Sequence, residues 1–165
     1  MDWFGLTAPI LQAPIGGAAS LAMVTAVGKA GGIGSLAMTW TEKEAGLEMV
    51  RALDRARVPF FLNFVLRFGA ERPLWYCGGA APAVTFSWGI DARLIAAFKA
   101  ARHRVGVQVG SVGGAREAIA AGSGAHRSAS TPCPENSCLR CQQVSPLHRD
   151  AEHICSNGKF IRLIA

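Results

Sequence analysis

The chain has 165 residues, of which half are hydrophobic and 17% are charged, and it carries a formal net charge of +6. This length and composition suit one globular domain with a real core and exclude a chain that is disordered throughout. The basic residues are spread along the sequence, and their densest group, residues 99–104, follows a predicted helix without interleaved aromatic residues, so we expect no nucleic-acid partner.

Targeting segments are not visible in the sequence. Asp2 stands where a signal peptide would begin its basic region. The longest apolar run, near residues 18–30, contains Thr25 and Lys29 and is too short to cross a bilayer. We therefore expect a cytoplasmic protein with reduced thiols and no membrane partner.

The first supersecondary unit lies near the N-terminus. A short apolar run over residues 10–13 predicts a strand, which ends at Pro14 because proline cannot donate to a strand ladder. Ser20 is a candidate N-cap for the helix that follows, and Gly31 suits the left-handed position that ends it. An apolar run over residues 33–36 begins the second strand, so the unit predicts two parallel strands with a right-handed crossover.

Three further apolar runs predict strands over residues 60–65, 84–88 and 105–109. Residues 66–82 contain several glycines and prolines, so only a turn or two of helix is expected there. Five strands that alternate with helices predict an α/β fold with a parallel sheet, either an open doubly wound sheet or part of a (β/α)8 barrel.

The predicted helices have recognisable starting residues. Thr41 and Glu44 form a candidate capping box for the helix after the second strand. Asp91 and Ser111 are candidate N-caps for the two helices that follow.

Two polar amides stand inside apolar strands near their carboxyl ends. Asn63 and Gln108 would each cost about 1–3 kcal/mol if they were buried without partners. Ligands of parallel α/β folds bind at this end of the sheet, and an amide can pair with a ring edge that carries N–H beside C=O. The alternative is that each amide bonds to a neighbouring loop backbone.

The turn with Ala13, Pro14 and Ile15 is expected at the same end of the sheet, where its backbone could face a planar ligand. The alternative is a tight turn without a ligand. The glycines near it do not form the G-x-G-x-x-G pattern of dinucleotide-binding folds.

These stretches together resemble the nitronate monooxygenase family, formerly called 2-nitropropane dioxygenases. The resemblance covers roughly residues 6–125 and rests on Gln-Ala-Pro-Ile-Gly-Gly, on Ala-Gly-Gly-Ile-Gly-Ser and on the strands near residues 61–65, 84–89 and 107–112. It implies a TIM (β/α)8-type barrel with bound FMN that oxidises alkyl nitronates with O2 to a carbonyl compound and nitrite.

By position, the resemblance implies that Ala13, Pro14 and Ile15 contact the isoalloxazine through their backbone. Asn63 and Gln108 would hydrogen-bond the flavin. FMN-dependent enoyl reductases of the same fold share the early motifs and are the alternative. The family's Glu-Ala-Gly-Gly-His motif is absent and the context of His126 does not match it, so no catalytic residue is assigned.

The pattern changes at residue 126. We assign residues 1–125 to a partial FMN-binding barrel and residues 126–165 to a divergent, irregular tail. Six tail residues have spacings that suit zinc or an iron–sulfur cluster. They are Cys133, Cys138, Cys141, Cys155, His148 and His153.

The interpretation that we favour for this tail is a change of reading frame or a truncation just after Ala125. It makes the cysteines accidental, so no metal ligand is predicted, and it leaves the activity of this chain in question. The opposite hypothesis is a non-catalytic remnant with a metal-binding tail. A partial barrel also leaves an open sheet edge, so we expect self-association.

Overall fold

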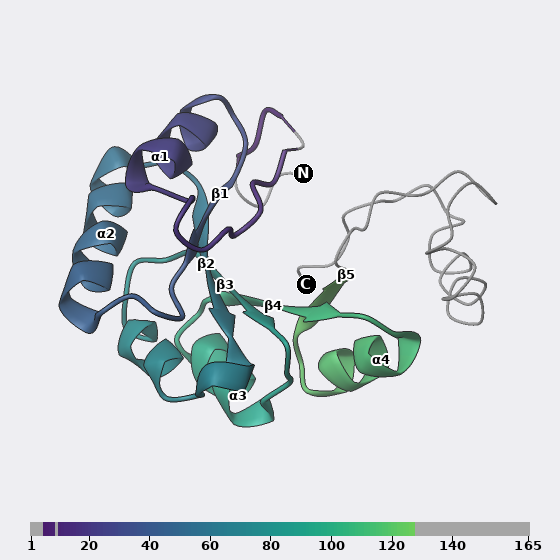
Figure 1. Ribbon diagram of the computed structural model, residues 1–165. Helices are drawn as coiled ribbons and strands as arrows, with labels where there is room; N and C mark the ends of the chain where they lie inside the picture. Colours follow the sequence, from purple (N-terminus) through teal and green to yellow (C-terminus); the bar gives the residue numbers. More distant parts are fainter. Residues whose placement is uncertain (1–4, 9, 128–165) are drawn as a thin grey trace.

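Helices and parallel strands alternate along the chain in the computed structural model, which describes residues 5–8 and 10–127 (Figure 1). One sheet has the strand order β1-β2-β3-β4-β5, and every neighbouring pair is parallel. The strands are β1 (Gly34–Ala37), β2 (Phe60–Val65), β3 (Ala83–Ser87), β4 (Arg104–Val109) and β5 (Gly124–Arg127). The predicted fold class, part of a TIM-type barrel with about five parallel strands, is confirmed.

Four α-helices follow one another in an arc along one side of the sheet (Figure 1). They are α1 (Leu21–Lys29), α2 (Lys43–Ala56), α3 (Ala92–Ala100) and α4 (Val112–Ala120). The predicted caps are confirmed at three of them, because the side chains of Ser20, Asp91 and Ser111 accept hydrogen bonds from backbone N–H groups of the first turn. The predicted capping box is wrong: α2 begins after Glu42, whose side chain makes no capping bond.

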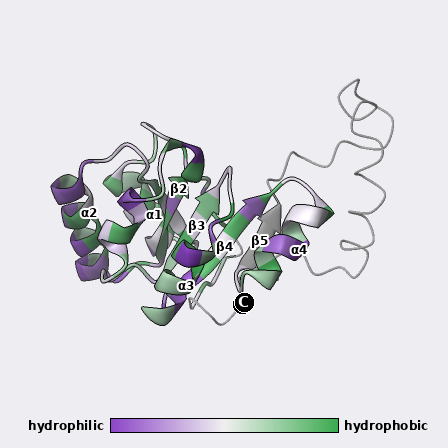
Figure 2. Ribbon diagram, turned by 90° about the horizontal axis from the view of Figure 1, so that it is seen from below, coloured by the Kyte–Doolittle hydropathy of each residue, from purple (hydrophilic) through white to green (hydrophobic). Residues whose placement is uncertain are grey.

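The main core lies between the sheet and these helices. Leu62, Phe64 and Phe86 point to this side of the sheet, where they pack against helix residues such as Leu53 and Ile95. Figure 2 shows the apolar character of the central strands and the mixed character of α2, which has one face in water. The opposite face of the sheet therefore receives the intervening residues, because successive strand side chains alternate between faces.

The crossover between β2 and β3 has no α-helix, as its glycines and prolines predicted. Two short 3-10 helices, η1 (Leu66–Phe68) and η2 (Arg72–Tyr76), take its place. Buried His103 holds this segment, since its two ring nitrogens lie 2.6 Å from the carbonyl oxygens of Ala81 and Cys77. These side-chain contacts add to the few backbone hydrogen bonds of the two 3-10 helices.

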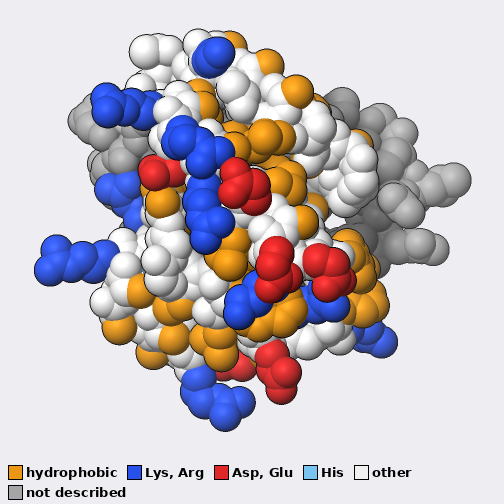
Figure 3. Space-filling view, turned by 90° about the vertical axis from the view of Figure 1, so that its left-hand side faces the viewer, with side chains coloured by type: hydrophobic (Ala, Val, Ile, Leu, Met, Phe, Trp, Pro, Cys, Tyr) orange, Lys and Arg blue, Asp and Glu red, His pale blue; other side chains and the backbone are white. Residues whose placement is uncertain are grey.

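Charged side chains are interspersed on the helical side. The face in Figure 3 carries Lys and Arg side chains among Asp and Glu side chains. On α2, for example, Glu48 pairs with Arg51 and Arg55, and hydrogen bonding to Arg55 lowers the pKa of the Glu48 carboxyl. Among the described residues, none of the helices has both the length and the apolar character that a membrane crossing requires.

Tyr76 packs tightly against α2, and this contact explains a glycine inside that helix. Its hydroxyl is buried and has no hydrogen-bond partner among the described residues, and burial raises its pKa above the usual value. A Cβ atom added at Gly46 would collide with this hydroxyl and would come within 2.7 Å of the Met38 methyl carbon. Glycine at position 46 is less favourable for the helix than alanine, but it leaves room for the Tyr76 ring.

We expect Gly46→Ala to lower the free energy of unfolding by about 1 kcal/mol, because overpacking outweighs the propensity gained from alanine. Tyr76→Phe removes the colliding oxygen, so Gly46→Ala should cost less in that background. Chemical denaturation of the four proteins of this double-mutant cycle measures the coupling. Additive effects would contradict the contact.

Candidate functional site

The face of the sheet opposite the helices changes from apolar to polar towards the carboxyl ends of its strands. Phe61 and Ala83 form a small apolar cluster near the amino ends. One row further on, Asn63 pairs with Thr85 in the strand register, and Ser87 and Gln108 lie beyond them. A ligand at the carboxyl edge would thus meet hydroxyl and amide groups before it met the apolar cluster.

Asn63 is 4% exposed, and its amide nitrogen is fully used within the sheet. Nδ2 donates to Thr85 Oγ1 and to Ser87 Oγ, each at 2.9 Å. These two bonds account for both amide hydrogens, so the side chain offers a ligand only its carbonyl oxygen. The amide thereby cross-links β2 to β3 whether or not a ligand is bound.

Gln108, by contrast, lines an open cavity of about 530 Å³. Its side chain is half-buried, and its amide makes no hydrogen bond to another described residue. The walls come from the loop after β3, the end of β4 and α4. They consist of Trp88, Gly89, Ile90, Gln108, Val109, Gly110, Gly114 and Glu117. Gln108 can therefore donate to and accept from a ligand in this cavity, while Asn63 lies outside its lining.

Glu117 is the one charged group among the lining residues just named, so the cavity carries a single negative charge and no positive one.

No group of three or more His, Cys, Asp or Glu residues that could hold a metal lies within the described ranges. The predicted tail ligands and residues 128–165 fall outside the described part of the chain. β5 ends at Arg127, and its backbone pairs His126 with Gln108 in the register.

The segment over residues 10–13 is not a regular strand, which corrects the sequence-based expectation. It forms a single parallel bridge between Leu11 and Ile33. The next ladder donor would be the N–H of residue 14, and Pro14 has none. The ladder ends there for this reason.

The Gln12 side chain replaces the lost ladder bonds. Its Oε1 accepts from the Ser35 N–H (3.1 Å), and its Nε2 donates to the Ser35 carbonyl (3.3 Å) and to the Ala13 carbonyl (2.9 Å). Ser35 Oγ donates in return to the Gln12 carbonyl (2.8 Å). The loop with Ala13, Pro14 and Ile15 is thus anchored at the sheet by a side chain that sequence reasoning missed, although a Gln two residues before Pro was visible.

The loop beyond this anchor is open. Ala13 is exposed, Pro14 is half-buried, and the Ile15 side chain is 54% exposed. A Cβ atom at Gly16 would lie 3.5 Å from the Trp40 ring, which places the loop beside the residues that follow β1. Its backbone is accessible to a ligand at the carboxyl edge.

Trp88 carries backbone strain at this edge. It directly follows β3 and has a left-handed φ of +56°. This conformation is a genuine outlier for a bulky residue and costs about 1–3 kcal/mol, and such strain is concentrated at binding sites. Its indole is nonetheless 66% exposed and forms part of the cavity wall.

Gln12→Ala should remove the anchor of the first loop. We expect the free energy of unfolding to fall by about 1–3 kcal/mol, because the buried N–H and C=O groups of Ser35 lose their partners. Amide hydrogen exchange should accelerate at Ser35 and little in α3, which the anchor does not touch. Unchanged exchange at Ser35 would show that the clamp does not hold the loop.

Comparison with solved structures supports this architecture. FabK from Thermotoga maritima superposes with a TM-score of 0.68 at 24% identity, over 74% of this chain and 40% of that chain. The chain has the fold of part of a (β/α)8 barrel. Nitroalkane oxidase from Streptomyces ansochromogenes gives a TM-score of 0.65 at 21% identity, over 76% of this chain and 51% of that one.

A third solved structure shares this fold. The enoyl reductase domain of MlnA, from the macrolactin biosynthesis cluster of Bacillus amyloliquefaciens, gives a TM-score of 0.55 at 18% identity, over 64% of this chain and 29% of that one. The chain therefore spans 29% to 51% of the length of these structures. No family model and no curated protein matches the sequence. Identities this low show a shared fold and leave the activity open.

Proposed function

We propose that the chain is a flavin-binding part of an oxidoreductase that oxidises alkyl nitronates with O2 to a carbonyl compound and nitrite. The observation that carries the proposal is the free amide of Gln108 in an open cavity at the carboxyl end of β4. The fold shared with a nitroalkane oxidase supports it. Bound FMN would accept electrons from the nitronate and pass them to O2.

The residues present suit the ring system of a flavin. Gln108 could both donate to and accept from a ring edge that carries N–H beside C=O, and Asn63 could accept through Oδ1. The backbone of Ala13, Pro14 and Ile15 would lie against the ring, held in place by the Gln12 anchor. The phosphate finds no cation among the residues that line the cavity.

The chain's own groups would orient and shield the ring rather than transfer protons. Asn63 is locked by Thr85 and Ser87, so its acceptor is pre-positioned and costs little entropy on binding. The cavity wall holds no His, and its one acid, Glu117, is exposed on α4. We therefore assign binding residues and no catalytic residue; a nitronate is already deprotonated, so its oxidation needs no group to remove a proton from carbon.

Titration of the purified full chain with FMN, followed by difference absorbance, tests the proposal. Gln108→Leu should raise the Kd about tenfold, because one amide pairing is lost. Ile119→Ala, an exposed change on α4, should leave it unchanged. Riboflavin should bind about as well as FMN, since the contacts are to the ring.

Failure of the wild-type chain to bind either flavin would overturn the proposed function. A strong preference for FMN over riboflavin would contradict a site built on ring contacts alone.

Enoyl reduction is the second candidate, because the enoyl reductase domain of MlnA shares the fold. The two activities differ in their reductant. Reduction of bound flavin by an added nitronate, with nitrite released in air, favours nitronate oxidation. Reduction by NADH or NADPH favours the enoyl reductase.

A further inference from the structure

Three exposed aromatic side chains gather at the carboxyl end of the sheet. Trp40, Phe68 and Trp88 come from the segments after β1, β2 and β3, and they are 59%, 55% and 66% exposed. The ring centroids lie 5.3 Å apart for Trp40 and Phe68 and 6.4 Å apart for Phe68 and Trp88. We call this group the aromatic rim.

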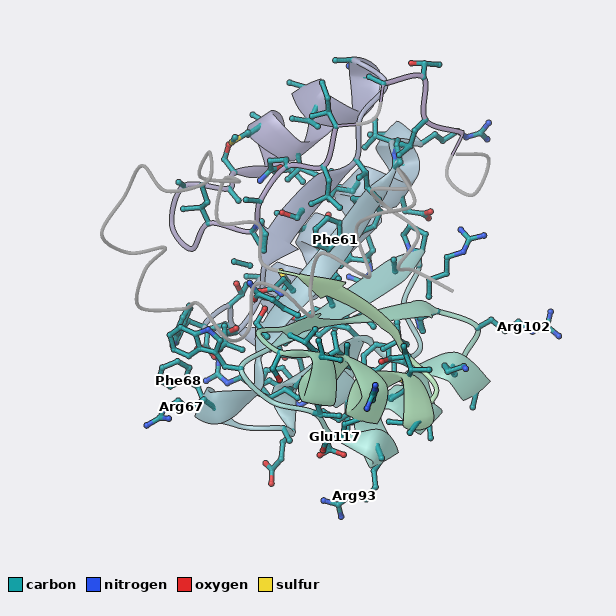
Figure 4. The ribbon with its side chains drawn as sticks, turned by 90° about the vertical axis from the view of Figure 1, so that its right-hand side faces the viewer. Phe61, Arg67, Phe68, Arg93, Arg102 and Glu117 are labelled. Carbon is teal, nitrogen blue, oxygen red and sulfur yellow. The ribbon has the colours of Figure 1, made fainter. Side chains whose placement is uncertain are left out.

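Strand polarity and the picture agree on the position of the rim. Phe68 follows the end of β2, whereas Arg102 precedes the start of β4. Figure 4 shows Phe68 beside Arg67 at one end of the sheet and Arg102 at the other. The aromatic rim therefore lies at the end where the strands deliver their ligand-binding loops.

The rim is continuous with the cavity. The Trp88 ring lies at a tilt beside the Phe68 ring, and Trp88 also lines the cavity that contains Gln108. On the other side, the Trp40 ring lies against the first loop at Gly16. The three rings thus span the distance between the two proposed flavin-binding features.

One residue of the rim, Trp88, has a strained backbone. Trp88 adopts its left-handed backbone at the strand end, where glycine or asparagine would fit with less strain. Exposed apolar groups rimmed by polar residues are characteristic of binding sites. The residues that line the cavity include no cation, so contact with the exposed rings of the rim can contribute to selectivity there.

We infer that the aromatic rim is the subsite for an aryl substituent of the substrate. This inference rests on the proposed function for the nitronate group itself. The ring planes of Trp40 and Phe68 are inclined by 55°, and those of Phe68 and Trp88 by 38°. Ring faces and edges of the aromatic rim therefore remain available for a further ring. An added ring gains edge or face contacts beyond the area it buries, which favours an aryl nitronate over a short alkyl one.

Anaerobic binding measurements test the subsite without turnover. The probes are the nitronates of phenylnitromethane and of nitroethane, which share the charged group and differ in the ring. Quenching of tryptophan fluorescence in the full chain reports binding, because Trp40 and Trp88 are themselves in the rim. We expect the aryl nitronate to bind about tenfold more tightly.

Phe68→Ala removes the central ring and keeps both tryptophans, so it should abolish most of that preference. Ile119→Ala is the matched control: this side chain is 58% exposed, but it lies near the end of α4, opposite the carboxyl edge. The control should keep the tenfold preference. Circular dichroism checks that both variants are folded.

Equal affinity for the two nitronates, no binding of either, or a preference that survives Phe68→Ala would each overturn the subsite. The first two results would fit a rim that is covered by another protein segment, and the third would mean that the aryl group binds elsewhere. Flavin binding is read separately by absorbance, so a chain that prefers the aryl probe without holding flavin refutes the proposed function and keeps the subsite.

Discussion

Parallel pairing in one register is the constraint on which the rest of this structure depends. Phe64 and Phe86 are neighbours across β2 and β3 and point into the helix-covered core. Each buried ring contributes about 1.5–3 kcal/mol, and a slip of either strand by one residue would move that strand's ring to the opposite face. The apolar residues therefore fix which positions, such as Asn63 and Gln108, face the other way.

This register explains why polar groups accumulate at one edge. The face opposite the helices begins with Phe61 and Ala83 and reaches hydroxyls and amides only near the carboxyl ends. Asn63 is satisfied there by its neighbours, which gives rigidity, while the Gln108 amide makes no hydrogen bond to another described residue. The same edge carries the strained Trp88. The satisfied amide thus cross-links β2 and β3, whereas the amide without a described partner lies on β4.

Local patterns in the sequence predicted the regular elements well. The strands over residues 60–65 and 105–109 are rich in apolar and β-branched residues, and the caps at Ser20, Asp91 and Ser111 act within one helical turn. Both signals are local, so no tertiary context was needed to read them.

The features that were missed depend on long-range contacts. The first ladder stops because Gln12 bonds Ser35, 23 residues away, in place of the absent Pro14 donor. The aromatic rim joins three loops that are separated in the sequence by whole elements. β5 is short and begins with glycine, so its pattern was too weak to predict a strand. Self-association through an edge strand, cytoplasmic location and the flavin contacts remain predictions.

Nuclear magnetic resonance of the isotopically labelled chain during titration with riboflavin tests the central claim most directly. We expect the largest shift changes at the backbone N–H groups of Ala13 and Ile15 and at the side-chain amide of Gln108. Gly78 and Gly79, which line a separate cavity beside α2, should not move. Shifts that concentrate at those two glycines, or that spare Gln108, would contradict a flavin site at the carboxyl edge of the sheet.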